Sequence, residues 1–175
     1  MGIAGSGKTT AATWFSKRYW VYKPFSFAAE VKAIALTMGW DGKKDEKGRQ
    51  LLQDIGMAGR RYHKDIWVSK LKKRLEDAKY LVIDDVRFQN EVDAIRANGG
   101  IVLRVVRSSL PIMDHPSETE LLRIVADQSI VNDGDLTNLY KQIDECFQFA
   151  TTAMDLQGGT EERNCSTGFS DGSVY

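Results

Sequence analysis

Hydrophobic residues follow two different periods along the chain, and the switches between these periods outline a fold. Apolar side chains recur at helical spacing over residues 28–39 and 65–78, whereas residues 80–83 and 101–106 are nearly continuous apolar runs. Residues 8–19, which are rich in Thr and Ala with aromatic residues toward the end, are also expected to form a helix. Such runs are typical of parallel strands that are buried on both faces. The other expected elements are a strand within 20–27, a short helix over 49–55 that ends at Gly56, a helix over 90–98, a strand at 129–131 and a helix over 135–150.

The order of these elements predicts the fold class. Strands that alternate with helices are typical of an α/β protein, in which a central parallel sheet carries helices on both faces. The chain has 175 residues, which fits one domain. We therefore expect a single domain over residues 1–155. Residues 156–175 are polar and aperiodic, and we expect a disordered or loosely packed tail there.

Composition narrows the class of function. Lys plus Arg number 24, as do Asp plus Glu, so the formal net charge is zero. This balance argues against a nucleic-acid partner and against an anionic membrane surface, because no overall field would attract them. No apolar run approaches the roughly 18 residues of a membrane span, and no signal peptide is visible. We expect a cytoplasmic enzyme whose anion site is built locally.

The sequence GIAGSGKT at residues 2–9 supplies such a site, since it matches the phosphate-loop pattern GxxxxGK[ST]. Glycines let the backbone N–H groups approach a phosphate, and the start of the following helix favours negative charge. Lys8 is expected to reach the β- and γ-phosphates of ATP, and the Thr9 hydroxyl to bind Mg²⁺, with Thr10 as a second candidate. The predicted cofactor-binding residues are Gly2, Gly5, Ser6, Gly7, Lys8, Thr9 and Thr10.

One feature departs from the usual context of this motif. A phosphate loop normally follows a buried strand, and here only Met1 precedes Gly2. We expect the strand to lie in a segment upstream of Met1. The alternative is a fold that has lost this strand, with weaker phosphate binding and lower stability.

Two adjacent aspartates follow the apolar run at 80–83. A carboxylate at the C-terminal end of a buried strand can hold Mg²⁺ or orient an acceptor. Asp84 and Asp85 are both candidate metal ligands, and Asp85 is also a candidate catalytic residue. Successive strand residues point to opposite faces, so one of the two should face the site, and the sequence leaves open which. The alternative is a strand-end turn with solvated carboxylates.

Arginines near these elements are candidates for phosphate contacts. Arg87 follows Asp85 by two residues, Arg60 and Arg61 are adjacent, and Arg107 closes the second apolar run. A guanidinium holds a phosphate with two parallel hydrogen bonds and stabilises charge on a transferring phosphoryl group. Arg87 and Arg107, with Lys8, are the candidate catalytic cations. For each arginine the alternative is a solvated surface position.

Several segments together resemble the deoxynucleoside monophosphate kinases of tailed bacteriophages. The resemblance covers roughly residues 1–150. It rests on GIAGSGKTT, FSFAAEVK at 25–32, RQLLQDIG and GRR within 49–61, DVRFQNEVDAIRANGG at 85–100, IVLRVVR, HPSETEL and VNDGDL.

This resemblance implies a three-layer P-loop fold and the transfer of the γ-phosphoryl group of ATP to a deoxynucleoside monophosphate, with Mg²⁺ required. It implies an acceptor region at about 25–65 and a lid at about 107–118, in which Arg107 closes on the phosphates. His115, in this loop, is a candidate for substrate contact or for a structural hydrogen bond. The implied acceptor-binding residues are Phe27, Lys32, Arg60, Arg61 and Arg87.

Other functions remain open on the sequence alone. A different small-molecule kinase would share the phosphate loop, and so would a P-loop ATPase or nucleotide-binding module that acts on nucleic acid or a protein partner. An inactive remnant that still folds is a further alternative. The accepted deoxynucleotide and the oligomeric state are not determined, and a homodimer is one option. If the chain is phage-encoded, it is expected in the host cytoplasm.

Overall fold

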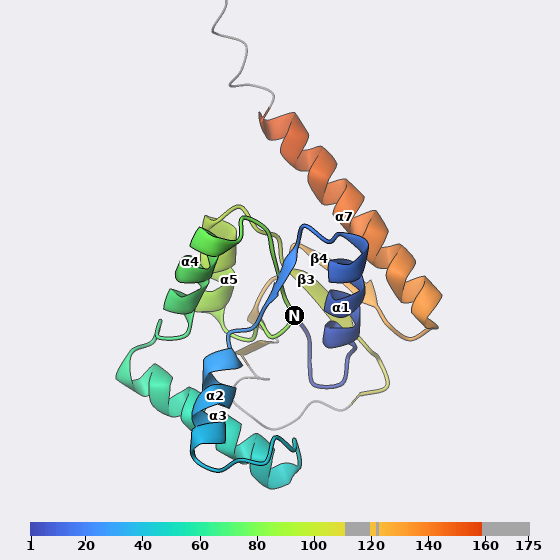
Figure 1. The fold of residues 1–175 in the computed structure, drawn as a ribbon. Coiled ribbons are helices and arrows are strands. Elements are labelled where there is room, and N and C mark those ends of the chain that lie inside the picture. Colours follow the sequence, from blue (N-terminus) through green and yellow to red (C-terminus); the bar gives the residue numbers. More distant parts are fainter. Residues whose placement is uncertain (111–119, 122, 159–175) are drawn as a thin grey trace, which may run out of the picture.

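A computed structural model describes residues 1–110, 120–121 and 123–158, with side chains to residue 149 (Figure 1). Helices and strands alternate along much of the chain, as the hydrophobic pattern predicts. The elements are α1 (Lys8–Arg18), β1 (Lys23–Phe25), α2 (Ala29–Thr37), α3 (Glu46–Tyr62), α4 (Val68–Asp77), β2 (Leu81–Ile83), α5 (Gln89–Ala97), β3 (Leu103–Val106), β4 (Gln128–Val131) and α7 (Leu136–Gly158).

The four strands form two separate parallel pairs. β1 pairs with β2 in a register that places Phe25 opposite Ile83, and β3 pairs with β4 so that Val105 lies opposite Ile130. The prediction of a single central parallel sheet is therefore confirmed only in part: the strands are parallel, but the two pairs are not hydrogen-bonded to each other. The first residue, Met1, lies between the two pairs (Figure 1).

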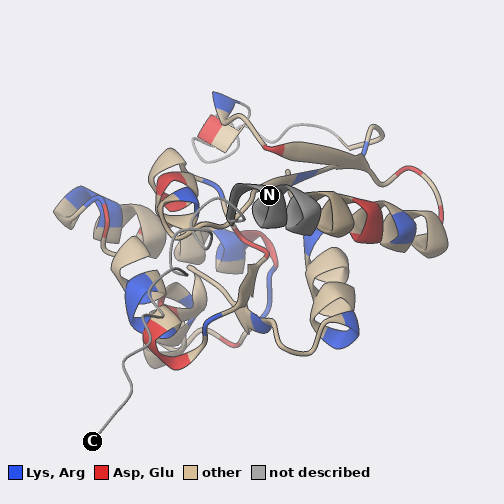
Figure 2. Ribbon diagram, turned by 90° about the horizontal axis from the view of Figure 1, so that it is seen from above, with Lys and Arg blue, Asp and Glu red and all other residues tan. Residues whose placement is uncertain are grey.

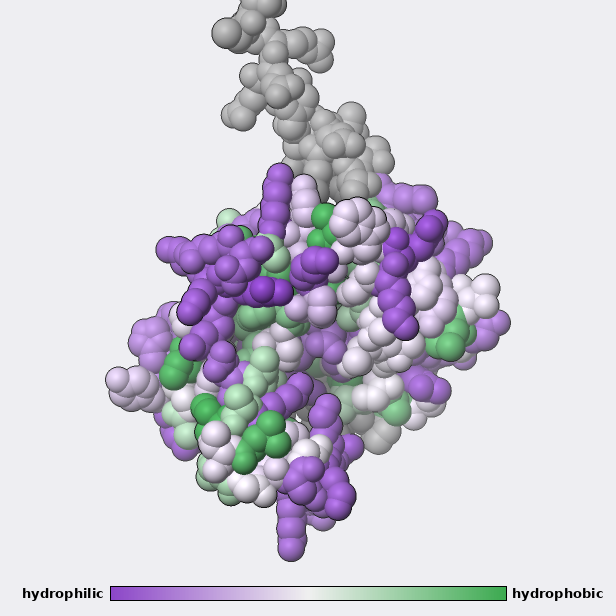
Figure 3. All heavy atoms as spheres, viewed as in Figure 1, coloured by the Kyte–Doolittle hydropathy of each residue, from purple (hydrophilic) through white to green (hydrophobic). Residues whose placement is uncertain are grey.

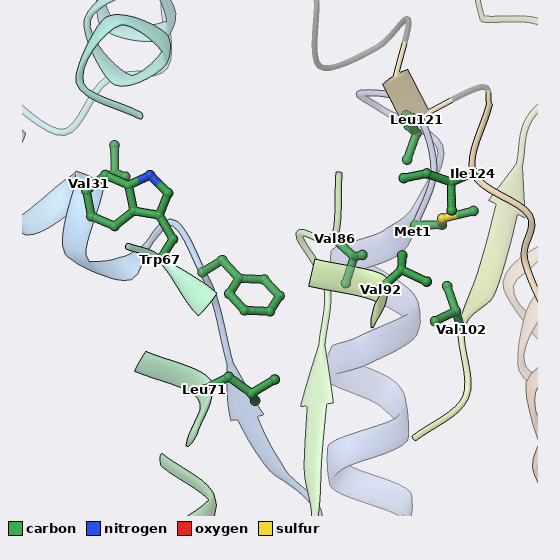
Figure 4. Packing of buried hydrophobic residues seen from close by; sticks show 10 residues of the cluster. Met1, Val31, Trp67, Leu71, Val86, Val92, Val102, Leu121 and Ile124 are labelled. Carbon is green, nitrogen blue, oxygen red and sulfur yellow. The ribbon is translucent and has the colours of Figure 1, made fainter. Parts of the chain in front are cut away.

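Two hydrophobic clusters hold the helices against these strands. The larger cluster includes Met1, Val92, Val102 and Ile124, which lie together in Figure 4. The smaller cluster joins α1 and α7 to β3 and β4, and its buried residues are Ala11, Val105, Ile130, Leu139 and Ile143. α1 and α7 lie on one side of the strands, and α4 and α5 lie on the other (Figure 1).

The prediction of a short helix over 49–55 was wrong, because α3 runs from Glu46 to Tyr62 and passes through both of its later glycines. Its start is fixed by Asp45, whose side chain accepts a hydrogen bond from the Gly48 N–H. Gly59 does not end the helix, because it makes room for Trp67: a Cβ there would lie 2.4 Å from the indole ring. The Trp67 Nε1–H also donates to the Gly56 carbonyl oxygen at 3.0 Å. Gly59 therefore serves close packing, whereas Gly56 has open space where a Cβ would lie and contributes only its carbonyl oxygen.

The last helix is longer than the pattern over 135–150 indicates. α7 extends to Gly158 and so includes the first three residues of the predicted tail, whereas residues 159–175 lie outside the described residues. Among the described helices, none combines the length and apolar character needed to cross a bilayer.

Candidate active site

The glycine-rich loop leads into α1 through a backbone that only glycine adopts easily. Gly2, Gly5 and Gly7 have φ angles of 147°, 81° and 101°. Space is limiting as well, because a Cβ on Gly2 would lie 2.4 Å from the Val105 carbonyl oxygen and one on Gly7 would lie 2.4 Å from Asn132 Nδ2. Glycine is therefore required where the loop passes β3 and the residue that follows β4.

Polar contacts hold this loop in a closed turn. Lys8 Nζ donates a 2.6 Å hydrogen bond to the Ile3 carbonyl oxygen, and Asn132 Nδ2 donates a 2.9 Å bond to the Ser6 carbonyl oxygen. Ser6 is fully buried, and its Oγ has no hydrogen-bond partner among the described residues. The Lys8 ammonium thus bridges the loop at the N-terminal end of α1, where the helix dipole favours an anion.

The two aspartates after β2 face different parts of the molecule. Asp84 Oδ2 accepts a 2.7 Å hydrogen bond from Thr9 Oγ1, beside the loop. The Asp85 carboxylate accepts from Ser26 Oγ at 2.7 Å and from the backbone N–H groups of the next two residues at 3.0 and 2.8 Å. Asp84 therefore lies at the phosphate loop, whereas Asp85 fixes the turn that leads into α2.

A second polar centre lies at the end of α3, where Arg60 meets α5. Arg60 Nη2 donates to Glu91 Oε1 at 2.5 Å, and the guanidinium carbon lies 3.7 Å from the centre of the Phe88 ring. Glu91 also accepts from the backbone N–H groups of Arg87 and Phe88, at 2.7 and 3.2 Å. Burial raises the pKa of Glu91, although these bonds and the Arg60 charge favour its carboxylate form.

Arg60 keeps one donor atom unused. Its Nη1 is buried and has no hydrogen-bond partner within the described part of the chain. Buried polar atoms are nearly always paired, so a buried guanidinium nitrogen without a partner indicates a place where an anionic ligand can bind.

The other predicted acceptor residues differ in exposure. Phe27 is 3% exposed, and its ring packs edge-on against Phe25 with the ring centres 5.3 Å apart. Lys32 on α2 and Arg87 after β2 are half-buried, whereas Arg61 is exposed. Arg87 is linked to the Arg60 centre in space, because its backbone N–H donates to Glu91.

The remaining predicted residues lie near the phosphate loop or outside the described residues. Thr10 is exposed on α1, one residue after Thr9, and Arg107 is exposed directly after β3. His115, together with most of the predicted lid at 107–118, lies outside the described residues.

Comparison with known proteins assigns this arrangement to a family. The model of the deoxynucleotide monophosphate kinase family matches residues 49–143. A putative deoxynucleotide monophosphate kinase of Acanthamoeba polyphaga mimivirus is 31% identical over 186 residues, which cover 86% of this chain and 95% of that protein. The chain belongs to the deoxynucleotide monophosphate kinase family. The deoxynucleotide monophosphate kinase of Escherichia phage RB69 is 39% identical over 70 residues, which cover 39% of this chain and 29% of that protein.

These matches confirm the resemblance seen in the sequence. The family model spans Arg60, Asp84, Glu91 and Asn132, and it begins after the glycine-rich loop. The loop motif and the family match are therefore separate lines of support, because they rest on different residues of the kinase.

Two residues of the candidate site were not predicted from the sequence. Glu91 is the third residue of α5, and it accepts a hydrogen bond from the N–H of Phe88, which precedes the helix. A glutamate at the third helical position often makes this bond, so its place in the sequence could have indicated the role. Asn132 follows a short strand in the run VND, and nothing in that run separates it from an ordinary loop residue.

The surface of the kinase agrees with its balanced composition. Basic and acidic residues are distributed over most helices rather than gathered on one element (Figure 2). Most of the face seen in Figure 3 is hydrophilic, with hydrophobic residues gathered in its lower part, where Figure 1 places α2 and α3. On α2, Ile34 and Leu36 are 41% and 56% exposed, and Met38, directly after this helix, is 63% exposed.

Proposed function

We propose that this protein transfers the γ-phosphoryl group of ATP to a deoxynucleoside monophosphate, with Mg²⁺ bound beside Thr9 and Asp84. One observation carries the proposal: in a chain of this kinase family, Thr9 of the phosphate loop bonds to a strand-end carboxylate, and the neighbouring Lys8 bridges the loop. The family supports the acceptor class, and the loop supports a nucleoside triphosphate as the donor.

The loop fits the phosphates of ATP by its shape and its donors. Its glycines adopt positive φ angles that let the backbone turn tightly, and its backbone lies at the positive end of α1. Lys8 supplies a cation that can exchange the Ile3 carbonyl oxygen for phosphate oxygens. Gly2, Gly5, Ser6, Gly7 and Thr10 complete the proposed ATP-binding set.

The donor set beside the loop fits Mg²⁺. A hydroxyl from Thr9 and a carboxylate from Asp84 are the hard oxygen ligands that this ion prefers. When bound, Mg²⁺ supplies positive charge that offsets the negative charge on the reacting phosphates. Asp85, which was also a candidate metal ligand and catalytic residue, is proposed instead to position the start of α2, since three donors already occupy its carboxylate.

We assign the acceptor phosphate to Arg60. Glu91 and the Phe88 ring fix the guanidinium, and the unpartnered Nη1 is available for an anion. A fixed guanidinium loses little conformational freedom when it binds a phosphate, which favours tight and oriented binding. Lys32, Arg61 and Arg87 are proposed around the same acceptor, with Phe27 in the apolar wall beneath it.

The reaction needs positioning more than it needs a base. A phosphate oxygen of the acceptor is already ionised near neutral pH, so it can attack the γ-phosphorus in line. A bond forms from that oxygen to phosphorus, the bond from phosphorus to the β,γ-bridging oxygen breaks, and ADP leaves with that oxygen. Lys8 stabilises the charge that develops on the transferred group. Arg87, Arg107 and the segment 107–118 are proposed to close over the phosphates and exclude water.

An acceptor panel tests this function. The chain is incubated with ATP, Mg²⁺ and dGMP, dTMP, dCMP or a modified dCMP, and both ADP and the deoxynucleoside diphosphate are measured. We expect diphosphate to form in step with ADP, and Lys8→Ala to lower turnover at least about 100-fold by removing transition-state charge stabilisation. Lys72→Ala, an exposed lysine on α4, is the matched control and should leave turnover unchanged.

The same panel separates the rivals. ADP release without any acceptor would favour an ATPase or nucleotide-binding module, and phosphorylation of a different small molecule would favour another kinase. A Lys8→Ala variant within tenfold of wild type would refute the assignment of the loop. A homodimer and a location in the host cytoplasm stay predictions.

A further inference from the structure

Two consecutive residues after β4 bond to segments beside the phosphate loop. Asn132 Nδ2 donates to the Ser6 carbonyl oxygen, so Asn132 contacts the loop directly. The Asp133 carboxylate instead accepts two hydrogen bonds from Ser108: Oδ1 accepts from the backbone N–H at 2.8 Å, and Oδ2 accepts from the hydroxyl at 2.6 Å. The phosphate-loop motif and the proposed metal and acceptor sites give Asp133 no role.

Ser108 lies in a tight turn that follows β3. The turn spans residues 107–110, because the Leu110 N–H donates to the Arg107 carbonyl oxygen at 3.3 Å. Asp133 holds both the backbone and the side chain of Ser108, with an ionised acceptor that makes these bonds stronger than bonds between neutral groups. The two bonds lower the pKa of Asp133, and the charge of Arg107 acts in the same direction, so the carboxylate stays ionised.

The same turn reaches the phosphate loop through Leu110. Its two methyl carbons lie 3.4 and 3.6 Å from the position that a Cβ on Gly5 would occupy, so the half-buried Leu110 side chain lies beside Gly5. A chain of contacts therefore runs from Asp133 through Ser108 and Leu110 to Gly5. The bond from Asn132 supports the next residue of the loop, Ser6.

The conformation of the loop governs its affinity for phosphates. A loop whose N–H groups already face the ligand loses little conformational freedom on binding, whereas a loop that opens freely has to be ordered first. Gly5 has a φ angle of 81° and, as a glycine, a wide choice of other conformations. A contact that restrains the loop at Gly5 from outside therefore favours the bound shape.

We propose that Asp133 is a positioning residue for the donor nucleotide: by holding Ser108, it keeps Leu110 beside Gly5 and maintains the phosphate loop in the conformation that binds ATP. This inference rests on the proposed function, because it takes ATP as the ligand of the loop. Its effect falls on ATP and not on the acceptor, since Arg60 is held by Glu91 and Phe88 on α5 and before it.

The variants separate this role from a contribution to folding alone. Asp133→Ala removes both bonds to Ser108, whereas Asp133→Asn keeps an oxygen that can accept from the N–H and an amide that can donate to the hydroxyl. Asp135→Ala is the matched control. Asp135 is an exposed acid on the same connection, and its carboxylate accepts from the Asn138 N–H in the first turn of α7 at 2.8 Å.

Three quantities are measured on the full chain and on each variant. The dissociation constant of ATP is measured by calorimetry with Mg²⁺ and without an acceptor. Initial rates give KM for ATP and KM for the deoxynucleoside monophosphate. Urea unfolding gives the stability, and all binding measurements are made where every variant is folded.

We expect Asp133→Ala to weaken ATP binding about three- to tenfold and to raise KM for ATP in proportion, with KM for the acceptor unchanged, because only the loop is released. Asp133→Asn should bind ATP within about twofold of wild type, since it retains both bonds. Asp135→Ala should lower the stability without changing the affinity for ATP. If Asp133→Ala lost stability but bound ATP as wild type does, its bonds would serve folding only and the proposal would be overturned.

A double variant shows whether Asp133 acts through Leu110. Leu110→Ala should weaken ATP binding by a similar factor, and the double variant should bind no more weakly than the weaker single variant, because both changes break the same chain of contacts. Losses that multiply would overturn the proposal. A wild-type chain that bound ATP but transferred no phosphoryl group would contradict the proposed function and leave this comparison valid.

Discussion

Thr9 Oγ1 donates a 2.7 Å hydrogen bond to Asp84 Oδ2, across 75 positions of the sequence. This bond joins the first turn of α1 to the end of β2, so the phosphate loop and the strand-end carboxylate are held as one unit. It also brings two oxygen ligands to the same side of the loop. The proposed metal site depends on this pairing, which makes Thr9 the most direct residue to test.

Replacing Thr9 with valine removes the hydroxyl and keeps the volume of the side chain. We expect Thr9→Val to lower kcat/KM for phosphoryl transfer about 10- to 100-fold and to raise the Mg²⁺ concentration needed for half-maximal rate, because a ligand to the ion is lost. Steady-state rates over a Mg²⁺ titration measure both effects. Thr9→Ser retains the hydroxyl and should remain within about threefold of wild type. Unchanged Mg²⁺ dependence in Thr9→Val would exclude the hydroxyl as a metal ligand.

Arg60 is expected to govern the affinity for the acceptor. Arg60→Lys keeps a positive charge but loses the planar fork that bonds Glu91 and leaves Nη1 available. We expect KM for the deoxynucleoside monophosphate to rise about tenfold or more while KM for ATP changes little, because the lost bonds are charge-assisted. Initial-rate kinetics with each substrate varied in turn separate the two constants.

The matched control for this variant is Arg49→Lys, an exposed position on the same helix, which should leave both constants unchanged. Arg60 also packs on Phe88, so its replacement can lower stability. Urea unfolding of Arg60→Lys therefore accompanies the kinetics. A variant that unfolds at lower urea but binds the acceptor normally would mean that Arg60 is structural only.

Stability should depend on pH through the buried amino group of Met1. Its pKa falls from 8.0 to about 5 on folding, so between these values the unfolded chain binds more protons than the folded chain. The free energy of unfolding therefore rises as the pH rises from about 5 to 8, by up to about 1.4 kcal/mol per pH unit from this group. Urea unfolding at pH 5.5, 6.5 and 7.5 measures the slope.

Acetylation of the Met1 nitrogen isolates this contribution, because the acetylated chain carries no titratable group there while all other side chains are unchanged. The free energy of unfolding should rise more steeply with pH in the free chain than in the acetylated chain, and the difference between the two slopes measures the contribution of the amino group. Parallel slopes would show that the amino group is solvated in the folded chain, contrary to its buried position.

Much of the fold followed from the hydrophobic pattern, and the exceptions have local causes. α1, α2 and α5 lie at the helices expected over 8–19, 28–39 and 90–98, and β2 and β3 lie within the apolar runs. α3 was cut short because Gly56 and Gly59 are residues that usually weaken a helix. The contact with Trp67 explains Gly59, and the sequence near the glycines does not show that contact. Nothing in the structure requires glycine at position 56.

In the candidate site too, the residues that could be predicted are contiguous in sequence, and those that could not are brought together only by the fold. The phosphate loop could be identified because its residues are contiguous and each has a defined conformational or chemical task. Asn132, which holds the loop through the Ser6 carbonyl oxygen, comes from more than a hundred residues away and carries no pattern of its own. The choice between Asp84 and Asp85 likewise required the fold, since adjacent strand residues are equivalent until one face is assigned. The assigned roles of all these residues stay predictions until the variants are measured.

Because Asp84 and Asp85 point in opposite directions, the register of β2 determines which carboxylate reaches Thr9. β2 pairs with β1 so that Ile83 lies opposite Phe25, and the two carboxylates follow directly. Insertion or deletion of one residue between α4 and β2 that shifted this register would turn every side chain of the strand to its other face. Asp84 would then point at the turn before α2, and Asp85 would point at the phosphate loop. The length of the short connection at residues 78–80 is therefore as tightly constrained as the identity of either aspartate.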